Sequence, residues 1–205
     1  MKFKTDQEKF WSGDFGNAYT KRNINLEKNN IAFFTKVLYR TQNINSIIEF
    51  GCNRGMNLQA LHTIFPSNTK ISAIEINDSA INIVKDLNIT DKLYHTSMLD
   101  FNVDYKRDLT FIKGVLIHIN PEFLQNVYQK LYDSSSKYIL ISEYYNPTPV
   151  EISYQGHREK LFKRDFAGEM LDKFPDLKLI DYGFVYHRDP WLTTDDENWF
   201  LLEKQ

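Results

Sequence analysis

Short apolar runs rich in β-branched residues alternate with longer amphipathic stretches along most of the chain. In the stretches, apolar residues recur three or four positions apart, as Leu58, Leu61 and Phe65 do, which is typical of the buried face of a helix. The runs predict strands, of which the third is the weakest, at 46–50, 70–76, 92–96, 109–115 and 138–143. Strands that alternate with helices in this way predict a parallel sheet with crossover helices on its faces.

Both ends of the chain depart from this alternation. Residues 31–38 form an apolar stretch of helical periodicity ahead of the first strand, which predicts a helix that covers one face of the sheet. A helix is also expected over 166–174, followed by strand-like runs at 177–186 and 198–203 with no helix between them. We therefore expect these two runs to pair as an antiparallel hairpin.

The segment from Asn146 to about Lys163 follows the fifth strand. It contains Pro147 and Pro149, which exclude a continuing helix. We expect a long irregular connection here, of the kind that usually carries function.

Composition and charge narrow the class of protein. The 205 residues carry 25 Lys and Arg against 27 Asp and Glu, so no excess positive charge favours nucleic-acid binding. The single cysteine, Cys52, cannot form an internal disulfide, and no Cys/His cluster has the spacing of a metal site. The amino terminus lacks the apolar segment of a signal peptide, and no apolar run is long enough to span a membrane. We expect a cytoplasmic, single-domain protein over residues 1–205 that binds neither nucleic acid nor membrane and holds no metal.

The clearest chemical motif is residues 47–55, Ile-Ile-Glu-Phe-Gly-Cys-Asn-Arg-Gly, where a buried strand enters a turn bounded by Gly51 and Gly55. Ligands of open α/β sheets bind at such carboxyl ends of strands. Gly51 is expected to let a ligand approach the backbone, and Gly55 opens the following helix. The spacing differs from the Gly-x-Gly-x-x-Gly of a dinucleotide fold and from a phosphate loop. A plain strand-to-helix turn is the alternative.

This motif resembles motif I of the class I S-adenosylmethionine-dependent methyltransferases, in which an acidic residue, here Glu49, and the glycine turn hold the methionine end of the cofactor. The chain departs from many members at Asn57, where they have a further glycine. The resemblance implies a three-layer, Rossmann-like α/β fold with a mostly parallel sheet and a carboxy-terminal antiparallel hairpin. It also implies S-adenosylmethionine as the cofactor.

Two acidic residues follow in the family's order. Glu75 ends the second strand, where a carboxylate suits the hydroxyls of a ribose. Asp100 follows the third strand and resembles the residue that accepts from the adenine amino group. The cofactor-binding residues expected in the core are Glu49, Gly51, Cys52, Asn53, Gly55, Asn57, Glu75, Ile76, Leu99, Asp100, Lys113 and Gly114. Cys52 is expected to fill space and to carry no chemistry.

The segment after the fourth strand, Lys-Gly-Val-Leu-Ile-His-Ile-Asn-Pro at 113–121, resembles that of small-molecule methyltransferases. The Asn/Asp-Pro-Pro-Tyr/Phe motif of enzymes that methylate exocyclic base nitrogens is absent there. His118 is the candidate catalytic residue, as a general base or as a group that orients the acceptor. The alternative is a structural histidine at a strand-helix junction.

The aromatic amino-terminal segment 10–23 precedes the sheet, and we expect residues 1–42 to form a helical lid on a core over 43–205. Tyr19 and Arg22 are three positions apart, and Arg22 is placed to pair with the cofactor carboxylate. Permanent aromatic packing is the alternative. The strings at 11–23, 160–166 and 182–184 resemble methylases associated with pseudaminic acid biosynthesis. The resemblance runs from Trp11 to the carboxyl terminus and implies a nonulosonic acid, or a nucleotide-linked sugar precursor, as the acceptor.

A local basic cluster between His157 and Arg164 suits an acidic sugar or a phosphate, although such charges are often only solvated. The residues expected to bind the acceptor are Glu143, Tyr145, His157, Arg158 and Lys160. The function expected from the sequence is therefore methyl transfer to a small polar acceptor. The alternatives are a non-catalytic sensor of the cofactor and a methyltransferase for another small metabolite or for RNA. The net charge of −2 argues against RNA as the substrate.

Overall fold

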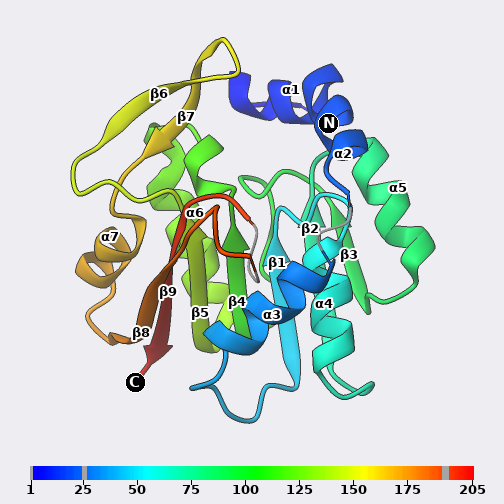
Figure 1. Cartoon of the computed structure of the whole chain (residues 1–205), viewed down its shortest axis with the longest axis vertical. Coiled ribbons are helices and arrows are strands. Elements are labelled where there is room, and N and C mark those ends of the chain that lie inside the picture. The colour runs from blue at the N-terminus through cyan, green and yellow to red at the C-terminus, as the bar shows by residue number, and fades with distance from the viewer. Residues whose placement is uncertain (1, 25–26, 191–193) are drawn as a thin grey trace.

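Seven strands form one sheet in the order β3-β2-β1-β4-β5-β9-β8 in the computed structural model, which describes residues 2–24, 27–190 and 194–205 (Figure 1). The strands are β1 (Ser46–Phe50), β2 (Lys70–Glu75), β3 (Lys92–His95), β4 (Arg107–Lys113), β5 (Ser135–Glu143), β8 (Leu177–Val185) and β9 (Glu197–Lys204). The first five are parallel, whereas β9 pairs antiparallel with both β5 and β8. The expected parallel sheet with a carboxy-terminal antiparallel hairpin is confirmed.

Helices cover both faces of this sheet. Phe34 of α3 packs against Phe111 of β4, with ring centroids 5.4 Å apart, and Val84 of α5 lies in a cluster with Ile71 of β2. The opposite face is covered by α6 and α7, whose buried side chains join the cluster around Ile112. The helices are α3 (Glu27–Val37), α4 (Met56–Ile64), α5 (Asp78–Leu87), α6 (Leu124–Ser134) and α7 (Phe166–Lys173). The helical periodicity in the sequence therefore marks the faces that are buried against the sheet.

The expected irregular connection over 146–163 is wrong. The segment contains an antiparallel hairpin of β6 (Val150–Tyr154) and β7 (His157–Lys163), outside the main sheet. Gln155 and Gly156 have φ values of +49° and +85°, as the two central residues of a tight type I′ turn require. The two prolines lie ahead of the hairpin, so they exclude a helix without preventing strands.

The fourth strand ends two residues earlier than expected, at Lys113. Gly114 has a φ of +65°, which turns the backbone away from the sheet, and a 3₁₀ turn, η1 (Leu116–His118), follows. A second 3₁₀ turn, η2 (Pro121–Phe123), leads into α6. Because β4 ends at Lys113, the loop that follows it lies at the carboxyl end of the sheet.

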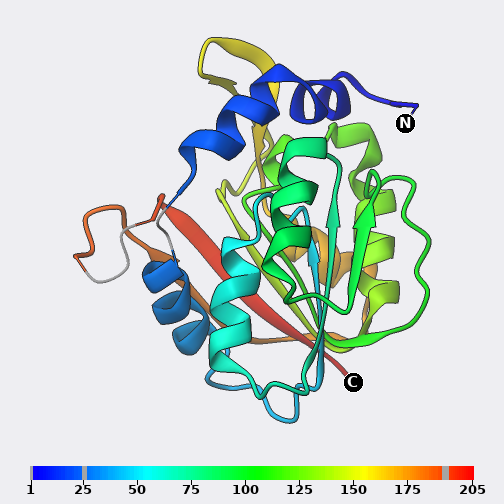
Figure 2. The same ribbon diagram turned by 90° about the vertical axis from the view of Figure 1, so that its right-hand side faces the viewer.

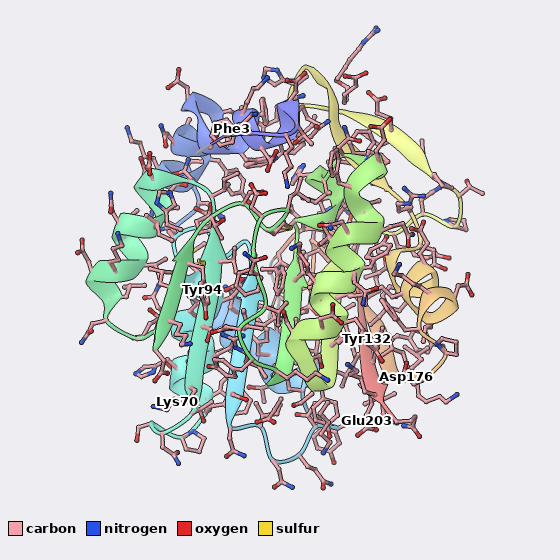
Figure 3. All side chains as sticks on the ribbon, turned by 180° about the vertical axis from the view of Figure 1, so that it is seen from behind. Phe3, Lys70, Tyr94, Tyr132, Asp176 and Glu203 are labelled. Atoms are coloured by element: carbon pink, nitrogen blue, oxygen red, sulfur yellow. The ribbon has the colours of Figure 1, made fainter. Side chains whose placement is uncertain are left out.

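Two short helices, α1 (Asp6–Ser12) and α2 (Asp14–Arg22), lie across one end of the sheet beside the β6–β7 hairpin (Figure 2). Seen from behind, Phe3 of this segment lies at the end of the molecule opposite Lys70 and Glu203 (Figure 3). Because Lys70 begins β2, the two helices lie at the carboxyl ends of the parallel strands. Among the described residues, no helix has the length and apolar character needed to cross a membrane.

Candidate functional site

A cavity of about 670 Å³ lies where β1, β2, β3 and β4 end, beneath α1, α2 and the β6–β7 hairpin. Its floor is formed by the residues that follow these strands, and its roof by the amino-terminal helices and Tyr154 of the hairpin. This is the position at which open parallel sheets bind their ligands.

The turn after β1 forms the centre of the floor. Gly51 has a φ of +80°, and a Cβ at this position would lie 2.9 Å from a methyl group of Val115. The backbone angle and the contact with Val115 therefore both require glycine at this position, and Gly51 also lines the cavity. Gly55, with a φ of +78°, begins α4 and packs against Val84. The two glycines let the chain reverse and bring the backbone of Cys52 and Asn53 to the cavity.

Glu75, at the end of β2, is held by backbone groups around the cavity. Its carboxylate accepts from the amides of Asn53, Ile76 and Asn77 at 2.7–2.8 Å. Burial raises the pKa of Glu75, although the three amide bonds oppose that shift. The side chain is 7% exposed and lines the cavity, so it is a fixed acceptor for hydroxyl donors of a ligand.

Glu49 lies beneath the floor and does not line the cavity. Its Oε1 accepts from Asn57 Nδ2 at 2.6 Å, while Oε2 is buried without a partner. Burial raises the pKa of Glu49 to about 8, so the carboxyl is mostly protonated at pH 7. Asn57 therefore fixes Glu49 and also reaches the cavity wall.

Cys52 lies in the floor with its thiol buried. Burial raises the pKa of this thiol well above its usual range, which keeps it neutral and unreactive. The expectation that Cys52 fills space agrees with this position.

The segment after β3 forms one wall of the cavity through Thr96, Ser97, Met98 and Leu99. Ser97 Oγ bonds the carboxylate of Glu8 in α1 and accepts from the amide of Leu99. These bonds attach the first amino-terminal helix to the wall.

Asp100 lies outside this wall. It pairs with Lys4 at 2.5 Å on the surface and is not among the residues that line the cavity. The structure therefore separates Asp100 from Glu75 and Asn53, with which the sequence groups it.

The other half of the cavity is bounded by the end of β4 and by β9. Lys113 Nζ pairs with Glu197 Oε1 at 2.7 Å, and Ser142 Oγ donates to Glu197 Oε2 at 2.8 Å. Tyr144 and Asp195 line the same side. Burial, together with a hydrogen bond to the Asp195 carboxylate, raises the pKa of Tyr144 above its usual range, so its phenol is a donor at pH 7.

His118 lies between the two halves. Its Nδ1 is 2.6 Å from the carbonyl oxygen of Lys160 on β7. Because a carbonyl only accepts, Nδ1 carries the proton of the neutral ring and Nε2 keeps a lone pair. Burial lowers the pKa of His118 to about 4, so the ring is neutral at pH 7. The side chain lines the cavity and packs against Trp11 and Tyr154.

The roof joins two segments that are distant in the sequence. Arg22 donates to Gln155 at 3.0 Å, and Gln7 donates to the carbonyl of Glu159 at 2.8 Å. Phe10 packs against His157 with ring centroids 4.9 Å apart. Tyr19 and Arg22 both line the cavity. The amino-terminal helices and the hairpin together form this roof, and we refer to these two segments as the lid.

Three buried polar atoms of cavity-lining residues have no hydrogen-bond partner: Gln7 Oε1, Trp11 Nε1 and Asn53 Nδ2. Buried polar groups are nearly always bonded to protein, water or a ligand, so these atoms mark where the cavity offers hydrogen bonds.

Comparison with known proteins gives a structural answer only. No family model matches the sequence, and no curated protein matches it significantly. A methyltransferase from Leishmania major that depends on S-adenosylmethionine superposes with a TM-score of 0.74 and 11% identity, over 97% of this chain and 81% of that chain. Magnesium protoporphyrin IX methyltransferase from Synechocystis, with S-adenosylmethionine bound, gives a TM-score of 0.68 and 10% identity over 100% of both chains. The chain has the class I methyltransferase fold.

The solved structures with this fold differ in what they act on. Besides the porphyrin enzyme, they include a didemethyltoxoflavin methyltransferase from Burkholderia thailandensis, with a TM-score of 0.69 and 11% identity over 97% of this chain and 87% of that chain. The methyltransferase fold therefore leaves the acceptor open.

The residues expected to bind an acceptor are not brought together. Glu143 is buried beneath the loop after β4, where its carboxylate accepts from the amides of Val115, Leu116 and Ile117. Tyr145, His157, Arg158 and Lys160 do not line the cavity. Lys160 lies over the ring of Phe10 in the lid, 5.6 Å from its centroid.

Several cavity-lining residues were missed in the sequence, because they lie in segments without a chemical motif: Gln7, Tyr144, Tyr154, Asp195 and Glu197. Tyr154 alone had a usable signal, because Val150, Ile152 and Tyr154 alternate as in a strand.

Proposed function

We propose that the protein is an S-adenosylmethionine-dependent methyltransferase that acts on a small polar acceptor. The observation that carries this proposal is the turn after β1, which brings the backbone of Asn53 and the fixed carboxylate of Glu75 to one enclosed cavity. The class I methyltransferase fold supports the same conclusion, because that fold places its cofactor at this end of the sheet.

The residues present fit the cofactor. Glu75 is an acceptor for the ribose hydroxyls, and the wall formed by Met98 and Leu99 suits an apolar ring face. Asn53 Nδ2 is a buried donor without a partner, and Arg22 is a cation at the same cavity; both suit the carboxylate of the methionine end. When bound, the cofactor supplies an electrophilic methyl group.

His118 is proposed as the general base. Its Nδ1 is engaged by the Lys160 carbonyl, so Nε2 is the nitrogen that can accept a proton from a hydroxyl or amine of the acceptor. The lowered pKa keeps this lone pair available at neutral pH. The lid excludes water from the reacting groups, and the walls align the acceptor.

The proposed acceptor is a nonulosonic acid or its nucleotide-linked precursor, as the resemblance implies. The support for this choice is confined to the sequence, since the cationic side chains expected to bind a carboxylate, Arg158 and Lys160, lie outside the cavity. Within the cavity, Tyr144 and the pair of Lys113 and Glu197 are polar groups that suit a hydroxylated molecule.

The proposal is tested first by calorimetry with S-adenosylmethionine and S-adenosylhomocysteine, for which one site per chain is expected. The second step is incubation with a labelled methyl donor and the small-molecule fraction of cell extract, followed by mass spectrometry. Absence of binding would contradict the proposal. Binding without any labelled product, also with purified nonulosonic acids, would favour a sensor of the cofactor instead.

A further inference from the structure

The side-chain amide of Gln7 in α1 is a polar group of the lid that the proposed function leaves unused. The residue is 6% exposed and lines the cavity. Its Nε2 donates to the carbonyl of Glu159, which fixes the amide orientation because a carbonyl cannot donate. Its Oε1 is buried without a partner. A buried acceptor without a donor destabilises the folded protein, so we expect a ligand donor at this position.

The position of Gln7 indicates which part of a ligand it meets. The next residue, Glu8, bonds Ser97, so this turn of α1 lies against the wall formed after β3. That wall offers the apolar side chains of Met98 and Leu99 to the cavity. The amide of Leu99 is already bonded to Ser97 Oγ. Gln7 therefore adds an unpartnered acceptor beside the apolar side chains of Met98 and Leu99, as recognition of a flat aromatic base requires.

Asp100, the residue expected to accept from the adenine amino group, lies outside the cavity. Asp100 points to the surface, where it pairs with Lys4. Among the buried atoms of the described cavity-lining residues that lack a partner, Gln7 Oε1 is the one acceptor, whereas Trp11 Nε1 and Asn53 Nδ2 are donors. A ligand group that only donates, such as an exocyclic amine, is therefore matched by Gln7.

We propose that Gln7 Oε1 accepts a hydrogen bond from the exocyclic amino group of the cofactor's adenine, so that the lid helix α1 reads the base in place of Asp100. This inference rests on the proposed function. The same amide is attached to the β6–β7 hairpin at Glu159, and the next carbonyl, that of Lys160, holds His118. Two consecutive carbonyls of β7 thus fix Gln7, which is proposed to bind the adenine, and His118, which is proposed as the general base.

The test measures the affinity of two ligands by calorimetry: S-adenosylhomocysteine and an analogue with hydrogen in place of the 6-amino group. The wild type is expected to bind the analogue about tenfold more weakly, the equivalent of one hydrogen bond. Gln7→Leu removes the acceptor and also the bond to Glu159, so it should weaken both ligands but abolish the tenfold preference, and the two dissociation constants should converge. Gln7→Glu keeps an acceptor oxygen but loses the donor to the Glu159 carbonyl, so it should bind both ligands more weakly while it keeps the preference for the amino group.

Two controls separate base reading from general loosening of the lid. Gln155→Ala removes the bond to Arg22 and should weaken both ligands alike, which preserves their ratio. Thermal unfolding identifies variants that fail to fold, in which case Gln7→Met replaces Gln7→Leu. A wild type without preference, or a Gln7→Leu variant that keeps the full tenfold preference, would overturn the role of Gln7. A wild type that binds neither ligand would overturn the proposed function itself.

Discussion

The two halves of the cavity are built in different ways. The half around Glu75 and Asn53 is made largely of backbone groups in two turns, the one after β1 and the one after β2. The half around Lys113 and Glu197 is made of side chains from strands that are distant in the sequence. The backbone groups of the first half take the same positions wherever the same turns form. The polar groups of the second half change whenever one of its side chains is replaced. This difference explains why one fold serves enzymes whose acceptors are unrelated.

Two buried carboxylates that line the cavity, one in each half, show the contrast most directly. Glu75 is satisfied by three amides of neighbouring backbone, at Asn53, Ile76 and Asn77. Glu197 is satisfied by Lys113 and Ser142, which come from two other strands. Changes in the half around Glu75 are therefore expected to affect cofactor affinity, and changes in the other half to affect acceptor use and rate.

Removal of the proposed base should have the largest effect. His118→Ala is expected to lower kcat roughly 10²-fold or more, while the affinity for S-adenosylhomocysteine stays within about threefold. His157→Ala is the matched control, because His157 lies on the exposed side of the hairpin and does not line the cavity. A steady-state assay with both substrates varied measures both effects. A His118→Ala variant with unchanged kcat would leave His118 with a structural role.

Loss of the ribose acceptor should have the next largest effect, on affinity. Glu75→Ala removes a buried hydrogen-bonded carboxylate and is expected to weaken cofactor binding by about 1.5–3 kcal/mol, roughly ten- to hundredfold. Because Glu75 also satisfies three amides, Glu75→Gln serves as the milder variant, and thermal unfolding checks its fold.

Asp100→Ala is the matched control for that measurement. Its position outside the cavity favours a change in cofactor affinity of less than about twofold, since surface ion pairs such as the one with Lys4 contribute little. Calorimetry that shows a larger loss for Asp100→Ala than for Glu75→Ala would reverse the assignment of these two residues.

The floor of the cofactor half predicts a pH dependence of stability. The pKa of Glu49 is about 8 in the folded protein against an ordinary 4.5, so the folded state holds a proton that the unfolded state has lost between these values. The contribution of Glu49 to the free energy of unfolding should therefore be greatest below about pH 4.5. It should fall as the pH rises from 4.5 to 8. The slope is at most about 1.4 kcal/mol per pH unit for one carboxyl.

Glu49→Gln should remove this share of the slope, because glutamine resembles the protonated form. Glu143 and Glu75, whose pKa values burial also raises, contribute to the remaining slope in the same direction, whereas the lowered pKa of His118 contributes the opposite slope below about pH 6.5. Urea unfolding at pH 5, 6, 7 and 8 measures the difference, and the exposed Glu122→Gln variant is the control. Identical slopes for the wild type and Glu49→Gln would show that Glu49 is ionised in the folded protein.

The smallest effect is expected in the basic cluster of the hairpin. Arg158 and Lys160 lie outside the cavity, so Arg158→Ala and Lys160→Ala should each change the KM of the acceptor by less than about 0.5 kcal/mol, or twofold. Lys113→Ala is the comparison. Lys113 lines the cavity, and its removal leaves Glu197 without its cation. A tenfold rise in KM on replacement of Arg158 would support the acceptor site expected from the sequence.

Most of the fold could be predicted from local patterns. The helical spacing of Leu58 and Leu61 and the apolar run of β1 require only neighbouring residues, and both appear where expected. The β6–β7 hairpin was missed because Pro147 and Pro149 are typical of irregular loops, whereas the alternation at Val150, Ile152 and Tyr154 is typical of a strand. Its Gln-Gly turn at 155–156 is a local signal as well, so this part of the fold was within reach of the sequence.

The candidate site likewise combines parts that local sequence patterns predict with parts that depend on contacts between distant segments. The sequence by itself determined the turn after β1 and the placement of Glu75, because hydrophobic spacing, glycine angles and strand ends act over a few residues. Only the tertiary structure decided that Gln7, Tyr144 and Glu197 share the cavity and that Arg158 does not. The reason is that contacts between distant segments depend on how strands and lid pack in three dimensions, which leaves no spacing in the chain to detect.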